Sequence, residues 1–177
     1  MIMLALICSL RKGGNTDRLV DYVLKGGKKF GGKSKRLYLY DHEISDCLRC
    51  CDCQKGNYLC TLNDGMQKIY PELEKADLIA FGIPYFDHGF SRRTKRFLAR
   101  MRPFASNGKS RGKSSVIVIC SSEDSNDCEQ LIEIMQVSFG YLGMRFAGKV
   151  FAKADEKKNI TRNQKVLKKA YELGYSL

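Results

Sequence analysis

Four cysteines fall within fourteen residues of the chain, in the pattern C-x2-C-x2-C-x6-C. They are Cys47, Cys50, Cys53 and Cys60. Thiolates are soft ligands that suit zinc or iron–sulfur clusters, and two-residue gaps let successive side chains converge on one inorganic core. Zinc sites more often use two separated C-x2-C pairs, so this single run favours an iron–sulfur cluster over zinc. Disulfides or idle thiols are the alternatives.

The remaining cysteines are expected to have other roles. Cys51 directly follows Cys50, and because the side chains of chain neighbours point apart, we expect a spare thiol rather than a fifth ligand. We expect the others to pack as small apolar groups. These are Cys8, Cys120 and Cys128.

A loop of small and polar residues, 8–16, lies between an apolar segment and an amphipathic one. Such a loop leaves backbone N–H groups and the positive end of a helix exposed, which suits a phosphate. The candidate contacts are Ser9, Arg11, Gly14, Asn15 and Thr16. The loop matches neither the Walker A motif nor the G-x-G-x-x-G of a dinucleotide site. Helix capping by Asn15 or Thr16 is the alternative, and it is compatible with anion binding.

Two adjacent aromatic residues follow a proline in the stretch 82–91. Tyr85 and Phe86 can flank a flat ring while backbone groups of the same loop meet its polar rim. An aromatic ligand that carries one phosphate would satisfy both loops. A polar loop, 121–125, is expected to touch the same ligand through Ser121. Ordinary core packing is the alternative for the two aromatic side chains.

Apolar segments alternate with amphipathic ones along the whole chain, and this order must position the loops. The strand-like segments are 2–8, 35–40, 77–83, 115–120 and 145–152, and the helical ones are 15–29, 64–74, 91–102, 127–142 and 161–173. Short apolar strands that alternate with helices predict a parallel sheet with helices on both faces. We expect an α/β fold, a flavodoxin-like, doubly wound, five-stranded sheet of order 2-1-3-4-5, in one domain over 1–177.

The cysteine segment, residues 44–63, is inserted between the second strand and the second helix. It is long for such a connection, so something must hold it, and a metal centre would do so. The phosphate loop and the aromatic loop instead follow strands one and three. In an open parallel sheet, ligands bind beyond the carboxyl ends of the strands, near the point where strand order reverses.

The charge is strongly positive, with 31 Lys and Arg against 19 Asp and Glu. The basic block, residues 91–113, holds nine of these cations and no acidic residue. Such a field favours anionic partners, although a solvated helix face is the alternative. We expect a cytoplasmic protein, because we see neither a signal peptide nor a membrane span and because reduced thiols suit that compartment. No Ser/His/Asp or Cys/His arrangement supports nucleophilic hydrolysis.

Three stretches resemble a known family, and the resemblance covers nearly the whole chain. Ser-Leu-Arg-Lys-Gly-Gly-Asn-Thr-Asp-Arg-Leu is similar to the phosphate loop of the NAD(P)H-dependent FMN reductase and flavodoxin-like group. The cysteine run, followed by Asn63-Asp64-Gly65-Met66, resembles the iron-sulfur flavoproteins in particular. Ile83-Pro84-Tyr85-Phe86, Ser91 and Lys95 through Arg100 resemble that family's flavin-ring segment and following helix.

The resemblance implies two cofactors. FMN would have its phosphate held by Ser9, Arg11, Asn15 and Thr16, and its ring by Pro84, Tyr85, Phe86 and Asp87. A [4Fe-4S] cluster would bind the four cysteines, near the flavin of a neighbouring subunit in a homodimer or tetramer. His88 lies beside the proposed flavin, where a ring contact and a solvent-facing position are both open.

The leading hypothesis is an FMN-dependent oxidoreductase of the iron-sulfur flavoprotein type, with an acidic ferredoxin-like donor for the basic block. The runner-up is a cluster-free FMN or quinone reductase that uses NAD(P)H. A third class is non-catalytic: an electron carrier, or a basic nucleic-acid binder with a zinc loop.

Overall fold

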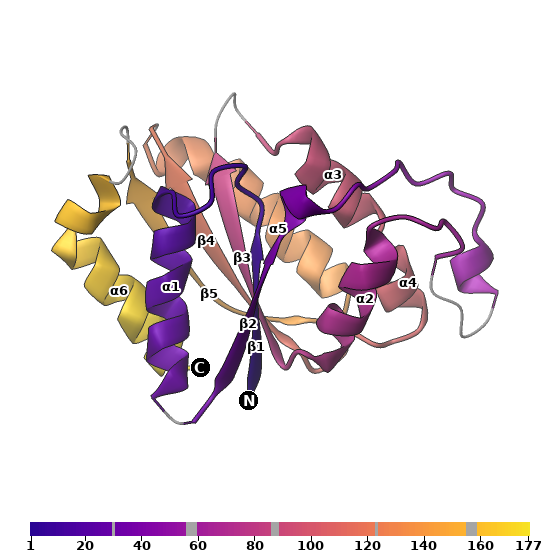
Figure 1. The fold of residues 1–177 in the computed structure, drawn as a ribbon, viewed down its shortest axis with the longest axis horizontal. Helices are drawn as coiled ribbons and strands as arrows, with labels where there is room; N and C mark the ends of the chain where they lie inside the picture. Colours follow the sequence, from indigo (N-terminus) through magenta and orange to yellow (C-terminus); the bar gives the residue numbers. More distant parts are fainter. Residues whose placement is uncertain (30, 56–59, 86–88, 123, 155–158) are drawn as a thin grey trace.

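The computed structural model describes residues 1–29, 31–55, 60–85, 89–122, 124–154 and 159–177. Five parallel strands form one sheet in the order β2-β1-β3-β4-β5, which confirms the predicted topology (Figure 1). The strands are β1 (Ile2–Ile7), β2 (Lys33–Tyr38), β3 (Leu78–Tyr85), β4 (Ser114–Ser121) and β5 (Arg145–Lys153).

The burial of each strand follows from its place in the sheet. β1, β3 and β4 are central and almost wholly buried, which is why their sequences are continuous apolar runs. β2 and β5 are the edges, and β2 exposes charged side chains such as Lys33 and Arg36. Charged residues on an edge strand discourage pairing with other chains.

Helices cover both faces of the sheet (Figure 1). α1 (Asn15–Lys28) and α6 (Gln164–Tyr175) pack side by side on one face. The other face carries α2 (Met66–Lys75), α3 (Arg92–Ala99), α4 (Arg102–Ser106) and α5 (Glu129–Tyr141). Each face has its own apolar core, as expected for a doubly wound sheet. Short 3-10 turns occupy Leu39–Asp41, Asp52–Gln54, Asn126–Cys128 and Asn159–Arg162.

The predicted helix 91–102 ends early: α3 stops at Ala99, and a separate short helix, α4, begins at Arg102. Pro103 lies in the first turn of α4 and has no N–H to donate to the carbonyl of Ala99, so a continuous helix would lose that bond. α3 instead ends at Ala99, and Arg100 caps it. The break gives Arg100 a position between two helices.

β3 also extends further than predicted, and Pro84 and Tyr85 are its last residues. The Gly82 carbonyl accepts a hydrogen bond from Cys8 N–H, so the backbone groups of Gly82 point toward β1. Pro84, two residues later, points its backbone to the same side, but β1 has already ended there. The N–H that proline lacks is therefore not needed for the β1–β3 ladder.

The cysteine segment leaves the sheet after the 3-10 turn at Leu39–Asp41. It runs out past α2, α3 and α4, and Asp52–Gln54 lie far from the strands (Figure 1). Among the residues that the structure describes, we find no helix with the length and apolar character needed to cross a bilayer.

Candidate functional site: a cavity at the strand ends and a thiol-lined cavity

A cavity of about 120 Å³ lies at the carboxyl ends of β1, β3 and β4. Every described residue that the sequence assigned to the cofactor lines it: Ser9, Arg11, Gly14, Asn15, Thr16, Pro84, Tyr85 and Ser121. These residues come from three separate loops or strand ends, which the 2-1-3-4-5 order brings together. The cavity lies beside the point where strand order reverses, where such sheets bind ligands.

The turn before α1 shapes one side of this cavity, where the sequence predicts a phosphate. The Ser9 hydroxyl accepts a hydrogen bond from Arg11 N–H at 3.3 Å, and Gly14 N–H donates to the Arg11 carbonyl at 3.2 Å. Gly14 is the N-cap of α1 and provides no side-chain cap, so the capping alternative for Asn15 and Thr16 is wrong. Asn15 Oδ1 instead accepts a hydrogen bond from Ile160 N–H at 3.3 Å. The start of α1, the positive end of the helix, therefore lies at this cavity without a side-chain cap.

Tyr85 is more deeply buried than the sequence predicts for a loop residue beside a flat ligand ring. Its side chain is buried, and its hydroxyl donates to the Asp127 carbonyl at 2.8 Å, just before α5. Tyr85 separates the strand-end cavity from a second one of about 160 Å³ beside α5. The side chain thus matches the core-packing alternative. Phe86 and Asp87, predicted to hold the flavin ring, and His88 lie outside the described residues.

The four predicted metal ligands line a separate cavity beside α3 and α4. Its wall includes Cys47, Cys50, Cys53 and Cys60, together with Cys51, Arg100 and Arg102. Burial raises the pKa of the Cys53 thiol, and Arg102 opposes that rise. The charges of Cys47 and Cys60 raise the same pKa further, so these thiols are close enough to interact.

Left-handed backbone conformations shape this turn. Arg49 has a φ of 53° and Cys51 a φ of 62°, an uncommon conformation for residues other than glycine. The Cys51 thiol also contacts the Arg49 carbonyl at 3.4 Å, from Sγ to oxygen. Cys51 lines the cavity with the four ligand candidates, so its role as a spare thiol stays a prediction.

The remaining cysteines are buried in the core, which confirms their predicted packing role. They are Cys8, Cys120 and Cys128. Burial raises the pKa of Cys8 to about 12 and that of Cys120 to about 12, so both are inert neutral thiols near pH 7.

The thiol-lined cavity has the ligand atoms that a soft metal prefers, but its volume is small. Among the described residues, no group of three or more His, Cys, Asp or Glu side chains is drawn together closely enough to hold a metal ion. The cavity, at about 20 Å³, has room for about one water molecule. Its four thiols are nevertheless free, and Arg100 Nε is a buried N–H donor with no hydrogen-bond partner in the described part of the chain. The donor set therefore fits an iron–sulfur cluster, whose sulfur atoms accept hydrogen bonds.

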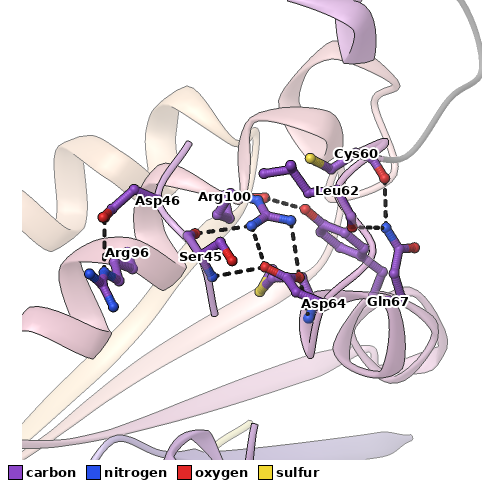
Figure 2. Close-up of polar contacts among 10 residues, drawn as sticks. Ser45, Asp46, Cys60, Leu62, Asp64, Gln67, Arg96 and Arg100 are labelled. Atoms are coloured by element: carbon purple, nitrogen blue, oxygen red, sulfur yellow. Dashed lines mark hydrogen bonds and ion pairs between the residues drawn. The ribbon is translucent and has the colours of Figure 1, made fainter. Parts of the chain in front are cut away.

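Arginines of α3, which the sequence assigned to a partner surface, instead pair with acidic residues of the chain itself. Arg93 and Arg96 lie on one face of α3 and pair with Glu43 at 3.0 Å and Asp46 at 2.9 Å (Figure 2 shows the second pair). Arg93 also donates to the His42 carbonyl at 2.6 Å. Their spacing of three residues was the signal, because it places both on the same side of a helix.

Arg100 and Asp64 form a third and more buried pair. The Arg100 side chain is 0% exposed and donates to Asp64 at 2.6 and 3.1 Å (Figure 2). Burial alone would raise the pKa of Asp64, but hydrogen bonds from Arg100 and from the N–H groups of Ser45 and Met66 lower it below its ordinary value. Asp64 is therefore ionised near neutral pH.

Part of the basic block is thus neutralised within the molecule. Besides the three arginines, Lys109 pairs with Glu74 at 2.9 Å, and Lys113 donates to two backbone carbonyls. The cations of the block for which the described part of the chain supplies no carboxylate are Arg92, Lys95, Arg102, Arg111 and Lys113, and the Lys113 ammonium is already bonded to the two carbonyls. The first four of these cations are left for an external anionic partner.

Curated relatives that share one name match about half of the chain. An iron-sulfur flavoprotein of Archaeoglobus fulgidus is 30% identical over 88 residues, which are 50% of this chain and 43% of the relative. An iron-sulfur flavoprotein of Methanocaldococcus jannaschii is 30% identical over 95 residues, 54% of this chain and 49% of the relative. The chain thus spans about half the length of the curated relatives it matches. These matches confirm the predicted resemblance to iron-sulfur flavoproteins.

Solved structures share the fold at low sequence identity. The Trp repressor binding protein of Bacillus subtilis superposes with a TM-score of 0.73 at 19% identity, covering 98% of this chain and 99% of that one. The NAD(P)H:quinone oxidoreductase of Methanothermobacter marburgensis gives a TM-score of 0.71 at 12% identity, with 99% and 98% coverage.

A family model also matches most of the chain. The model of the NADPH-dependent FMN reductases aligns with residues 1–158, so it includes all five strands, the strand-end cavity and the cysteine segment. Since this match covers most of the chain, the protein belongs to the NADPH-dependent FMN reductase family.

Proposed function

We propose that this protein is an FMN-dependent oxidoreductase of the iron-sulfur flavoprotein type, in which electrons pass between FMN and a [4Fe-4S] cluster. One observation carries the proposal: a single chain has both a strand-end cavity lined by the predicted flavin contacts and a separate cavity lined by four free thiols. Family membership and the names of the curated relatives support the same pairing.

The residues of the strand-end cavity have distinct tasks in this proposal. Ser9, Asn15 and Thr16 donate to the phosphate of FMN at the start of α1, and Arg11 supplies a positive charge. Pro84 and Tyr85 offer a rigid strand end against the flavin ring. FMN, when bound, supplies the change between one-electron and two-electron transfer.

The residues of the second cavity would hold the cluster. Cys47, Cys50, Cys53 and Cys60 would supply four thiolates, and the Arg102 charge opposes the rise that burial causes in the pKa of Cys53. The resemblance to iron-sulfur flavoproteins supports the further proposal that the cluster lies close to the flavin of a neighbouring subunit in a homodimer or tetramer.

A cluster-free NAD(P)H-dependent FMN or quinone reductase is the second candidate. The small volume of the thiol-lined cavity favours it, since about 20 Å³ leaves no room for a cluster without rearrangement. In that case the cysteines would be structural or redox-sensing.

Anaerobic purification followed by a visible spectrum and analysis of FMN, iron and sulfide tests both candidates. The leading proposal predicts flavin absorbance together with about four irons per chain. Flavin without iron, and no iron uptake on reconstitution, would favour the second candidate. Colourless protein that takes up neither would reject both and leave the nucleic-acid binder.

A further inference from the structure

The buried pair between Arg100 and Asp64 connects both ends of the cysteine segment. Asp64, four residues after Cys60, accepts hydrogen bonds from Ser45 N–H at 2.8 Å and Met66 N–H at 2.9 Å. Arg100 donates to the Ser45 carbonyl at 3.0 Å. Ser45 lies two residues before Cys47, so one ion pair fixes the backbone on both sides of the segment (Figure 2).

Gln67 extends this contact to a ligand candidate itself. Its side-chain amide donates to the Cys60 carbonyl at 2.6 Å and to the Leu62 carbonyl at 2.7 Å (Figure 2). The two bonds come from α2, which begins directly after the segment. The backbone of Cys60 is thereby fixed relative to the core.

A buried ion pair is an expensive way to stabilise a fold, because apolar residues of similar size often do so at least as well. Arg100 is charged, 0% exposed at its side chain, and part of the wall of the thiol-lined cavity. Its Nε–H donor is buried and has no hydrogen-bond partner among the described residues. The buried charge and the unbonded Nε–H are both explained if the ion pair acts on the thiol-lined cavity as well as on the packing of the core.

We propose that Arg100 and Asp64 are positioning residues for metal uptake, whose ion pair holds the two ends of the cysteine segment together so that its thiols face one centre. This inference rests on the proposed function. A loop with fixed ends loses less conformational entropy when its ligands converge, so the clamp raises metal affinity without touching the metal.

The decisive variant is the double substitution Asp64→Leu with Arg100→Met, which replaces the buried pair by apolar groups and leaves no lone charge in the core. A purely structural pair predicts unchanged metal binding in this variant. A positioning pair predicts weaker binding of Co²⁺, the probe, by about 10-fold to 100-fold, as found when groups that orient metal ligands are removed. FMN content and the melting temperature report whether the fold is intact.

Gln67→Met provides a milder second variant, since Gln67 is only half-buried and its loss frees Cys60 without removing a charge. It is expected to weaken Co²⁺ binding less than the double variant and to keep its FMN. Lys109→Gln is the matched control, because it breaks an ion pair of the same basic block that lies away from the thiols. Its Co²⁺ affinity is expected to equal that of the unmodified protein.

Two results would count against the inference in different ways. If the double variant and Gln67→Met both bound Co²⁺ as tightly as the unmodified protein, the positioning role would be wrong while the proposed function stood. If the unmodified protein bound neither Co²⁺ nor iron and sulfide, the proposed function would fail first, and the positioning role with it. Hydrogen exchange at Ser45 and Met66 N–H, both bonded to Asp64, shows independently whether the segment's ends are released.

Discussion

At the scale of single residues, two arginines of the chain have opposite kinds of environment. Arg100 is buried, paired and central to the fold of the cysteine segment, whereas Arg11 lines the strand-end cavity with its side chain exposed. The first is expected to matter for structure and metal uptake. The second is expected to matter for the ligand alone.

Replacement of Arg11 by Gln should weaken FMN binding by about 10-fold, because a charge-assisted hydrogen bond to the phosphate is lost. Fluorescence titration with FMN and with riboflavin checks the cause, since riboflavin lacks the phosphate and should bind the variant and the unmodified protein alike. Lys12→Gln is the matched control: Lys12 is the next residue but pairs with Asp41 at 2.7 Å. An equal loss in both variants would mean a general electrostatic effect.

At the scale of elements, the packing of α1 against α6 depends on glycines that allow close approach. Gly174 of α6 lies so near Val23 of α1 that a Cβ there would collide with the Val23 carbonyl. Gly26 makes the same kind of approach to the backbone of α6. The start of α1 forms one side of the strand-end cavity, so this contact links the packing of two helices to the site proposed for the phosphate.

Gly174→Ala should therefore lower the free energy of unfolding by about 1–3 kcal/mol, as overpacking in a tight contact does. Urea unfolding at equilibrium measures the change. Gly140→Ala on α5 is the control, because no atom lies within 4 Å of a Cβ built there. That variant should gain about 0.5–1 kcal/mol from helix propensity. A stable Gly174→Ala protein would show that the two helices can move apart at no cost.

At the scale of the whole molecule, the main feature is the positive charge. The net charge is +12, and the cations of the basic block that stay without a carboxylate in the described part of the chain include Arg92, Lys95 and Arg111. The predicted acidic ferredoxin-like partner would meet these side chains. Because Arg93, Arg96, Arg100 and Lys109 pair with carboxylates of the chain itself, the surface proposed for a partner is smaller than the sequence suggests.

Electron transfer from an acidic donor protein should therefore slow as salt rises, because screening shortens the reach of these charges to about 8 Å at physiological ionic strength. Stopped-flow reduction at increasing NaCl concentrations measures this rate. A triple replacement of Arg92, Lys95 and Arg111 by Gln should remove most of the salt dependence. If the reduction rate of the unmodified protein did not change with NaCl concentration, a donor guided by charge would be ruled out.

The sequence alone determined the order of strands and helices, the place of the strand-end cavity and the identity of the candidate ligands. Those features follow from local signals: apolar runs of strand length, a small polar loop before a helix, and a fixed spacing of cysteines. Parallel topology then brings Ser9, Pro84 and Ser121 to one edge without further information.

Only the tertiary structure decided the inward position of Tyr85 and the clamp on the cysteine segment. Arg100 and Asp64 are 36 residues apart, and Tyr85 and Asp127 are 42 apart. No sequence pattern predicts either contact, because each one forms only after separate elements have packed together. The basic block therefore looked like a surface for partners until folding placed its arginines opposite the acidic residues around the cysteines.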